Sequence, residues 1–206
     1  MVVVSISRVS TNASGSVETQ GGRSGYIATI AGLSIGAFAV YTPEEGINIK
    51  MLARDIDHLR ESFANDHGQG RAGKLILRNE RASKTYTTEI IANMIREEAC
   101  GRFEARFAIP GHVQQGGAPS PMDRVRAVRL AVKCIQFLEK GEAEASVIGI
   151  KGSKVVFTPM EELERDDTDW AERRPKKEFW LRLRDTVDTL SGRYRPVTKP
   201  ARPESC

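Results

Sequence analysis

Segments with helical periodicity alternate with short extended segments along this chain, and this alternation constrains the fold more than any other feature. Apolar residues at three- and four-residue steps indicate amphipathic helices, and short apolar runs bounded by turn residues indicate buried strands. We expect helices at residues 25–36, 49–63, 85–99, 120–140 and 179–190, and strands at residues 37–41, 74–80, 103–109, 146–150 and 154–159. Such alternation predicts an α/β domain with a mainly parallel sheet.

The expected helices differ in how clearly their buried face and their ends can be identified. Residues 49–63 are predicted to be amphipathic, with an apolar face that consists of Ile49, Leu52, Ile56, Leu59 and Phe63. Residues 85–99 are predicted to bury Ile90, Ile91, Met94 and Ile95. The helix from residue 120 has the clearest start, because Ser120 suits the N-cap, Pro121 the first turn and Asp123 the third helical position.

Size and composition narrow the class of protein. With 206 residues, of which 40% are apolar, the chain can form one compact domain or two small lobes. The net charge of +4 is spread along the chain without a basic run, so we expect no nucleic-acid partner. No apolar stretch approaches the roughly 20 residues of a membrane span, and the apolar start MVVVSIS lacks the features of a signal peptide. We therefore expect no membrane partner.

The cysteines point to the same cellular setting. Cys100, Cys134 and Cys206 are odd in number and follow no metal-ligand spacing, which argues against a disulfide framework and against a zinc site. We expect a cytoplasmic protein.

Parallel α/β sheets bind ligands at the carboxyl ends of their strands, so the loops that follow the strands are the places to search. Gln20 to Gly25 reads Gln-Gly-Gly-Arg-Ser-Gly and precedes a helix. Its glycines would let backbone N–H groups approach an anion at the positive helix end, but a tight turn that needs positive φ explains them equally well. Arg78-Asn79-Glu80 ends a strand, where a carboxylate can accept hydrogen bonds from sugar hydroxyls, and a solvated charge is the alternative.

The third loop has the most unusual composition. Arg106 precedes Gly111-His112-Val113-Gln114-Gln115-Gly116-Gly117, and the capped helix follows. Arginine offers a planar fork for phosphate, histidine a donor whose charge rises with a bound anion, and the two glutamines offer neutral donors. This composition favours a site for an anion or a sugar phosphate over a structural turn.

Several nucleotide and metal motifs are missing from the sequence. It contains no GxxxxGK[ST] phosphate loop, no kinase glycine-rich loop and no aspartate-rich magnesium motif. Asp166 and Asp167 lie in a polar segment and are predicted to be solvated. We therefore expect no cofactor or metal in this chain.

Three motifs, in order, resemble the C-terminal half of the duplicated 6-phosphofructokinases of fungi and animals. They read VETQGGRSGYIATIAGLSIGA, LRNERASKTYTTEII and FEARFAIPGHVQQGGAPSPMDRVRAVRLA, and KVVFTPMEELE and RRPKKEFWLRLR are similar to the end of that half. The resemblance covers roughly residues 17–184. It implies a phosphofructokinase-type sandwich of a parallel sheet with helices on both faces.

The resemblance also implies that the two halves of the enzyme have different functions. In this family the N-terminal half carries ATP, Mg²⁺ and the catalytic aspartate, and the C-terminal half binds the activator fructose 2,6-bisphosphate. Catalytic halves have Met-Gly-Arg where this chain has Gln20-Gly21-Gly22, and His-x-Gln-Arg-Gly-Gly where it has His112-Val113-Gln114-Gln115-Gly116-Gly117. The loss of both arginines suits a pocket that binds without catalysing.

By motif, the resemblance implies the effector contacts Gln20, Gly21, Gly22, Glu80, Arg106, His112, Val113, Gln114, Gln115 and Arg173. No catalytic residue and no metal ligand is implied in this chain. An arginine that matches Arg106 reaches into the pocket of the neighbouring subunit in this family, so the expected partners are other phosphofructokinase subunits and fructose 2,6-bisphosphate or a related sugar phosphate.

The N-terminus departs from the family pattern. A helix, most of a strand and an arginine expected before Glu18-Thr19-Gln20 are missing, as is the nucleotide-binding lobe. We divide the chain into an atypical segment at 1–16, a phosphofructokinase C-terminal-half domain at 17–192 and a loose tail at 193–206. The half is then incomplete, and its sheet is expected to have an apolar edge unless MVVVSIS covers it.

We therefore expect part of an ATP-dependent 6-phosphofructokinase that transfers the γ-phosphoryl group of ATP to fructose 6-phosphate. This chain would supply the allosteric site and subunit contacts and would be inactive alone. Two alternatives stay open: a stand-alone sugar-phosphate-binding or inactive partner protein, and a non-functional truncated gene product.

Overall fold

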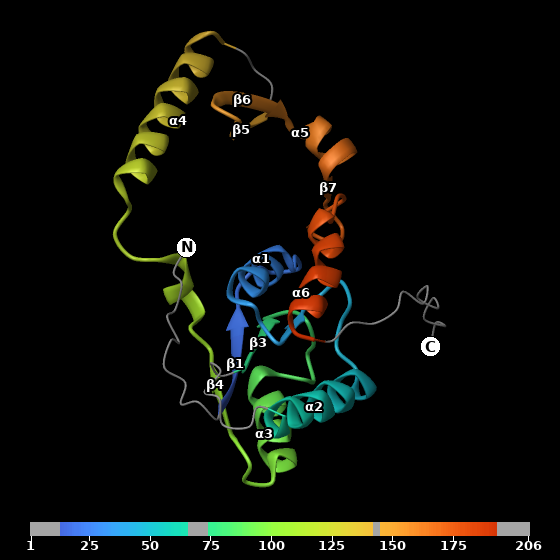
Figure 1. The fold of residues 1–206 in the computed structure, drawn as a ribbon. Coiled ribbons are helices and arrows are strands. Elements are labelled where there is room, and N and C mark those ends of the chain that lie inside the picture. Colours follow the sequence, from blue (N-terminus) through green and yellow to red (C-terminus); the bar gives the residue numbers. More distant parts are fainter. Residues whose placement is uncertain (1–12, 66–73, 142–144, 193–206) are drawn as a thin grey trace. The chain divides into compact units, whose positions relative to one another are not determined.

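The computed structural model describes residues 13–65, 74–141 and 145–192. The chain divides into two compact units. We call residues 13–111 together with 179–192 the sheet unit, and residues 112–178 the hairpin unit (Figure 1). Each unit is described by itself.

Four parallel strands form the sheet of the sheet unit. They are β1 (Ala13–Thr19), β2 (Ala39–Tyr41), β3 (Lys74–Asn79) and β4 (Glu104–Ala108), in the order β2-β3-β1-β4. Successive strands in the chain are joined through helices, as parallel pairing requires. The predicted α/β class and the parallel sheet are confirmed.

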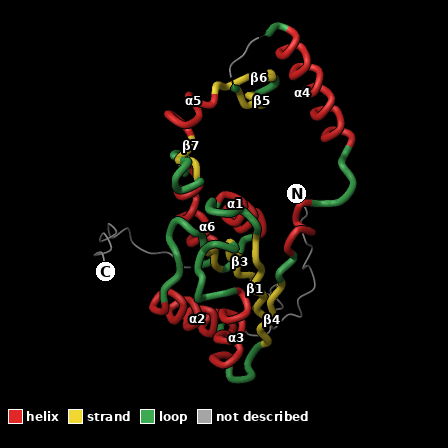
Figure 2. Tube along the Cα trace, turned by 180° about the vertical axis from the view of Figure 1, so that it is seen from behind, coloured by secondary structure: helices red, strands yellow, loops and turns green. Residues whose placement is uncertain are grey.

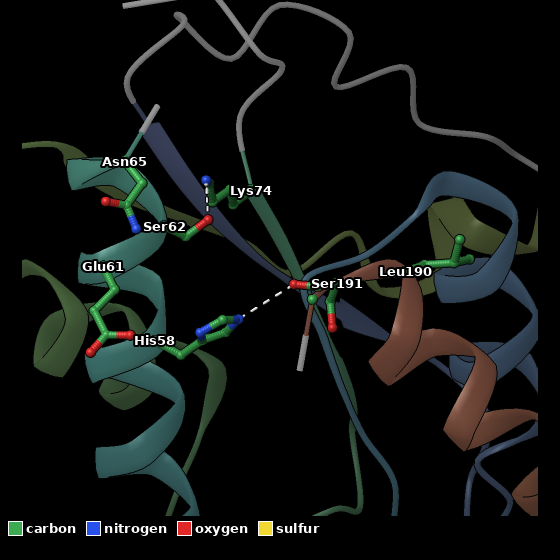
Figure 3. Close-up of a pocket in the computed structure, with 8 residues that line it drawn as sticks. His58, Glu61, Ser62, Asn65, Lys74, Leu190 and Ser191 are labelled. Carbon is green, nitrogen blue, oxygen red and sulfur yellow. Dashed lines mark hydrogen bonds between the residues drawn. The ribbon is translucent and has the colours of Figure 1, made fainter. Parts of the chain in front are cut away.

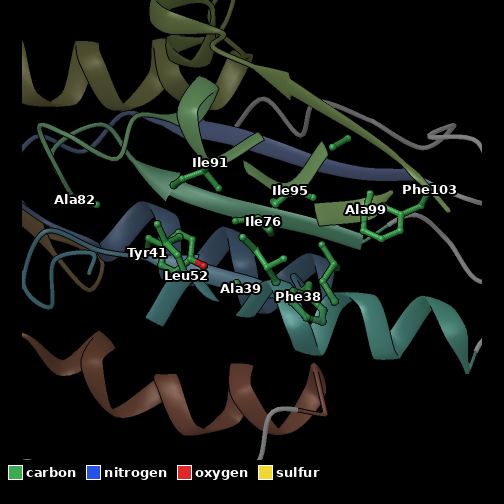
Figure 4. Packing of buried hydrophobic residues seen from close by; sticks show 13 residues of the cluster. Phe38, Ala39, Tyr41, Leu52, Ile76, Ala82, Ile91, Ile95, Ala99 and Phe103 are labelled. Carbon is green, nitrogen blue, oxygen red and sulfur yellow. The ribbon is translucent and has the colours of Figure 1, made fainter. Parts of the chain in front are cut away.

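Helices cover both faces of this sheet, as Figure 2 shows from behind. They are α1 (Tyr26–Ile35), α2 (Ile49–Ala64), α3 (Thr88–Ala99) and α6 (Arg184–Leu190), the last preceded by the 3-10 helix η3 (Phe179–Leu183). Because side chains alternate along a strand, each strand contributes to two cores. Ile76 packs with α2 and α3 in the larger core (Figure 4), whereas its neighbour Leu77 packs with α1 and α6 in the smaller one.

Three details differ from the sequence predictions. Ile90 is 41% exposed, because α3 turns Ile91 and Ile95 toward the sheet and Ile90 lies about 100° and about 140° around the helix from them. Ile49 is also exposed, since it is the first residue of α2. The expected single helix at 179–190 begins as the 3-10 helix η3 and becomes α-helical at Arg184.

β1 is a central strand with an unusual composition. Residues 13–16, expected to belong to an atypical segment, form its first half, so the strand expected to be mostly missing is present. Ser14 and Ser16 are buried, and their hydroxyls have no hydrogen-bond partner among the described residues. Unpaired buried hydroxyls destabilise a fold, so β1 is a weak element in the middle of the sheet.

The sheet has an apolar edge at β4. Phe107 on β4 and Ile109 beyond it are exposed. The segment MVVVSIS, proposed to cover such an edge, lies outside the described residues.

The hairpin unit is built on the helix α4 (Pro121–Glu139), which the predicted capping box starts: the Ser120 hydroxyl accepts from the Asp123 N–H, and the Asp123 carboxylate accepts from the Ser120 N–H. Its hairpin consists of β5 (Ser146–Lys151) and β6 (Lys154–Pro159), which pair antiparallel. Shorter elements follow: α5 (Met160–Glu162), a π-helix (Leu163–Asp167), β7 (Thr168–Asp169) and β8 (Arg174–Pro175). Phe137 of α4 stacks on Phe157 of β6, with ring centroids 4.3 Å apart.

Among the described residues, no helix is both long enough and apolar enough to cross a bilayer. The proposed boundaries at 16/17 and 192/193 stay predictions.

Candidate functional site

The loop that joins β1 to α1 is held by polar residues at the carboxyl end of β3. Glu80, which follows β3, accepts hydrogen bonds at Oε1 from the N–H of Gly22 (2.9 Å) and of Gly21 (3.4 Å). Asn79 donates from Nδ2 to the Ser24 carbonyl at 2.9 Å. The carboxyl end of β3 therefore fixes the shape of this loop.

A second carboxylate holds the other end of the same loop. Glu44, which follows β2, accepts at Oε1 from the Gly25 N–H (2.7 Å) and from the Trp180 Nε1–H (3.1 Å). A carboxylate at a helix N-terminus is favoured by the helix dipole. The positive end of α1, considered above as a place for an anion, thus already faces a carboxylate of the protein.

Glycine is required at two positions of this loop. A Cβ on Gly21 would lie 2.7 Å from both Asn79 Nδ2 and the Ser24 carbonyl oxygen. Gly22 takes φ of 56°, the left-handed region that glycine adopts at little cost. The Ser24 N–H donates to the Gly21 carbonyl across the turn. The tight-turn interpretation of these glycines therefore describes the loop as it stands, and a ligand contact by Gln20, Gly21 and Gly22 stays a prediction.

Arg78 is a buried structural residue, not a solvated charge. Its guanidinium pairs with Glu18 at 2.8 Å and donates to the carbonyls of Tyr86 and Ser83, in the segment that connects β3 to α3. Glu18 also accepts from the Thr88 hydroxyl at 2.8 Å. Burial lowers the pKa of Arg78, and the nearby carboxylates of Glu18 and Glu80 act in the opposite direction.

Arg106 lies apart from Glu80 within the chain. It pairs with Gly15 of β1, which pairs with Leu75 of β3, so Arg106 stands five residues before Glu80 along the sheet. At about 3.3 Å per residue this is a separation of roughly 16 Å along the strand direction, and the two strand spacings between β3 and β4 add to it. Its exposed guanidinium bonds to Glu104, with Nε to Oε2 at 2.9 Å.

The remaining predicted contacts belong to the hairpin unit. His112, Val113, Gln114 and Gln115 lie on a 3-10 helix, η1 (Gly111–Gln115), in which no residue is buried. Arg173 lies exposed at the turn between β7 and β8 with φ of 51°, a conformation uncommon outside glycine.

Among the predicted residues, the structure brings Gly21, Gly22 and Glu80 together by hydrogen bonds and places Gln20 in the same loop. Sequence reasoning did not single out Glu18 or Glu44, although both shape this site. Glu44 had a usable signal, because it follows the strand Ala39–Tyr41 in a loop where a ligand was expected.

A separate cavity of about 360 Å³ lies at the opposite end of β3 (Figure 3). Its lining residues are His58, Glu61, Ser62, Asn65, Lys74, Leu190, Ser191 and Gly192. The C-terminal ends of α2 and α6 contribute to it, and helix C-termini disfavour anions. Lys74 also donates to Ser62, so this cavity is a poor place for a sugar phosphate.

The described residues contain no group of three or more His, Cys, Asp or Glu side chains that could hold a metal ion.

The fold and the site define a class of protein: a parallel α/β domain with polar loops at the carboxyl ends of its strands. A family model described as phosphofructokinase matches residues 3–138. The chain therefore belongs to the phosphofructokinase family.

Individual relatives agree with this assignment. The chain is 65% identical to an ATP-dependent 6-phosphofructokinase of Aspergillus niger over 191 residues, covering 86% of this chain and 24% of that protein. It is 52% identical to the ATP-dependent 6-phosphofructokinase of Yarrowia lipolytica, covering 87% of this chain and 20% of that protein. The chain thus spans a quarter or less of the length of these relatives.

Solved structures agree as well. The phosphofructokinase of Saccharomyces cerevisiae is similar with a TM-score of 0.77 and 46% identity, over 88% of this chain and 25% of that one. The T-state phosphofructokinase of Pichia pastoris is similar with a TM-score of 0.73 and 44% identity, over 90% of this chain and 23% of that one. The predicted phosphofructokinase fold is confirmed.

Proposed function

We propose that this chain contributes an allosteric sugar-bisphosphate site and subunit contacts to a cytoplasmic 6-phosphofructokinase, and not its catalytic centre. The whole enzyme would transfer a phosphoryl group from ATP to fructose 6-phosphate, with ATP and Mg²⁺ bound by other parts of the enzyme. Family membership supports the enzyme class. Gln20-Gly21-Gly22 and Gln115, which stand where catalytic halves carry arginines, support a site that binds without catalysing.

The observation that carries the proposal is the placement of Glu80. Its half-buried carboxylate lies at the carboxyl end of β3 and holds Gly21 and Gly22 through one oxygen. A carboxylate has lone pairs for several donors, so Glu80 can also accept from sugar hydroxyls without releasing the loop. The residues that position the loop would then also recognise the sugar.

The phosphates require other residues, because Glu80 would repel them. Arg106 and Arg173 carry exposed positive charges, and His112 is an exposed donor. Guanidinium groups bind phosphates through paired hydrogen bonds. The separation of Arg106 from Glu80 within one chain suits an arginine that serves the pocket of a neighbouring subunit.

Calorimetry with fructose 2,6-bisphosphate tests this proposal. We expect the chain to bind it, and Glu80→Ala to weaken binding about tenfold or more, since it removes a charged hydrogen-bonding group. Glu89→Ala, at an exposed position of α3, is the matched control and should bind like the native chain. A folded chain that gives no heat with the ligand would refute the effector site.

A coupled assay tests the non-catalytic part. We expect no turnover of fructose 6-phosphate by the purified chain with ATP and Mg²⁺. Magnesium-dependent turnover would place a catalytic centre in this chain and overturn the proposal.

A further inference from the structure

Helix α1 begins without a side-chain cap of its own. Its N-cap residue is Gly25, which has no side chain to accept from the first N–H groups of the helix. The Gly25 N–H donates over 2.7 Å to Oε1 of Glu44, which follows β2 and is 19 residues away in the chain. Gly25 is also the last residue of the segment Gln20 to Gly25, which we call the glycine loop. A distant carboxylate therefore fixes the point where the glycine loop becomes α1.

The position of the Glu44 carboxylate depends in turn on Trp180. Oε1 of Glu44 accepts from the Trp180 Nε1–H at 3.1 Å, whereas Oε2 is buried and has no hydrogen-bond partner among the described residues. A Cβ on Gly25 would lie 2.6 Å from this Oε2, so the carboxylate packs directly against the backbone of the glycine loop. Loss of the indole donor would leave a buried carboxylate with one described N–H donor, which is unfavourable.

Trp180 is itself held by several contacts. Its side chain is 3% exposed, and its ring lies edge-on to the ring of Tyr26, the first residue of α1, with centroids 5.8 Å apart. Further along the chain, Arg184 of α6 pairs with Glu45, and Val187 is buried in the smaller core. All of these residues belong to the sheet unit, and they make the indole N–H a fixed donor.

The glycine loop is short and is held at both ends. Glu80 accepts from the N–H groups of Gly21 and Gly22, and Glu44 accepts from that of Gly25. Only two residues separate Gly22 from Gly25, and two residues have few soft dihedral angles. A displacement at the Gly25 end is therefore passed on to the end that Glu80 holds.

We propose that Glu44 and Trp180 are positioning residues of the glycine loop. Trp180 fixes the Glu44 carboxylate, Glu44 fixes the Gly25 end of the loop, and the loop thereby keeps Gly21 and Gly22 in place for the sugar bisphosphate. The last of these steps rests on the proposed function of the chain. The affinity of the effector site then depends on an indole N–H that is not itself a ligand contact.

Amide hydrogen exchange tests the positioning without any ligand. Trp180→Phe removes the Nε1–H donor and keeps an aromatic ring, and we expect the Gly25 amide to exchange about tenfold faster relative to the Leu77 amide of β3. Leu77 lies in a strand that is paired on both sides, so its amide reports any loss of stability of the whole sheet. The matched control is Trp170→Phe, the same substitution in the hairpin unit, which should leave the ratio of the two rates unchanged.

A second pair of variants covers the case in which Trp180→Phe does not fold. Glu44→Gln keeps an acceptor oxygen but loses the charge that strengthens its hydrogen bonds, and should raise the same ratio about threefold. Glu45→Gln is its control, because it removes the charge pairing with Arg184 but no contact of the glycine loop. Equal acceleration of Gly25 and Leu77, or an unchanged Gly25 rate, would show that these residues only stabilise the fold and would overturn the proposal.

Calorimetry with fructose 2,6-bisphosphate tests the consequence for affinity. We expect Trp180→Phe to weaken binding about threefold or more, and Trp170→Phe to have no effect. In a Glu44→Ala background, Trp180→Phe should cause no further loss of affinity, because Trp180 acts through Glu44. Additive losses, or equal affinities of Trp180→Phe and the native chain, would overturn the proposal.

The two measurements separate this inference from the proposed function. A native chain that does not bind the effector, but whose Gly25 exchange responds to Trp180→Phe, refutes the effector site and supports the positioning of the loop. A native chain that binds the effector, but whose Gly25 exchange does not respond, refutes the positioning and supports the effector site.

Discussion

The sheet unit and the hairpin unit both contain helices and strands, but they differ in what their side chains do. Every buried residue that the structure describes lies in the sheet unit, where two cores enclose the sheet. In the described part of the hairpin unit, the best-packed contacts are a pair of stacked phenylalanines and a half-buried helix face. The described part of the hairpin unit therefore forms backbone-bonded helices and strands although it contains no buried residue.

This difference has a thermodynamic consequence. Burial of apolar surface supplies most of the free energy of folding, at about 25 cal/mol per Å², whereas exposed helices of this length are marginal alone. We expect the sheet unit to unfold cooperatively and the hairpin unit, taken by itself, to be less stable. The two tryptophans allow this to be observed, because Trp180 belongs to the sheet unit and Trp170 to the hairpin unit.

The largest effect is expected from Arg78→Met. Removal of the guanidinium leaves the Glu18 carboxylate without its positively charged partner in a largely buried site, so we expect a loss of about 3–5 kcal/mol in the free energy of unfolding. Urea unfolding followed by Trp180 fluorescence in a Trp170→Phe background measures it. Arg165→Met, which breaks the exposed pair with Asp166 in the hairpin unit, should leave this transition unchanged. Equal losses in the free energy of unfolding for the two variants would show that the charge pair of the sheet unit is no more important for stability than that of the hairpin unit.

The next largest effect is expected from a pair of isoleucine truncations. Ile91→Ala empties a site that is 1% exposed and should cost about 2–5 kcal/mol. Ile135→Ala changes a side chain that is 55% exposed and should shift stability by less than about 0.5 kcal/mol in the isolated chain. Urea unfolding of the two variants gives both values. A large loss for Ile135→Ala would reveal a core in the hairpin unit.

A smaller effect is expected from two glycine substitutions. Gly21→Ala forces the new methyl group against Asn79 and the Ser24 carbonyl, and should cost about 1–3 kcal/mol and weaken effector binding. Gly149→Ala, in β5, places a methyl group where no atom outside the two adjacent residues lies within 4 Å, so it should be neutral. Thermal unfolding and calorimetry with fructose 2,6-bisphosphate check both. A fully stable Gly21→Ala chain would mean that the loop is not held as described.

The smallest effect concerns pH and the start of α4. Hydrogen bonds from the Ser120 side chain and backbone hold the pKa of Asp123 below its ordinary value of 3.8. Because the folded pKa is depressed, the contribution of this cap is complete above pH 3.8 and is lost as the pH falls through the folded value. Circular dichroism should show slightly less helix at acid pH for the native chain. The difference in helix content between the native chain and Asp123→Asn should be smaller at acid pH than at neutral pH. A difference in helix content that does not change with pH would exclude a role for the ionisation of Asp123 in stabilising α4.

Much of the fold could be predicted because its signals are local. The 3.6-residue periodicity located α2 and α3, and the Ser120–Asp123 capping box located the start of α4. The exposure of Ile90 could not be predicted, because periodicity left more than one apolar residue as a candidate for the inner face and only packing on the sheet selected Ile91 and Ile95.

The candidate site was predictable in part. Gly21, Gly22 and Glu80 were singled out by loop composition and by resemblance, and the structure brings them together. Glu18 was missed because an isolated glutamate has no motif, and Glu44 was missed although its place after a predicted strand was a usable signal. Their partners lie far away in the chain: Arg78 is 60 residues from Glu18, and Trp180 is 136 residues from Glu44.

The sequence by itself determined the α/β class, most of the helices and strands, the family and the loops that carry the candidate site, because each depends on short-range periodicity or on contiguous motifs. The tertiary structure alone decided that Glu44 and Glu80 hold the glycine loop, that Arg78 is buried with Glu18, and that buried side chains gather in the sheet unit. The physical reason is that burial and charge pairing depend on which distant residues the fold brings into contact, and such contacts leave no local pattern in the chain.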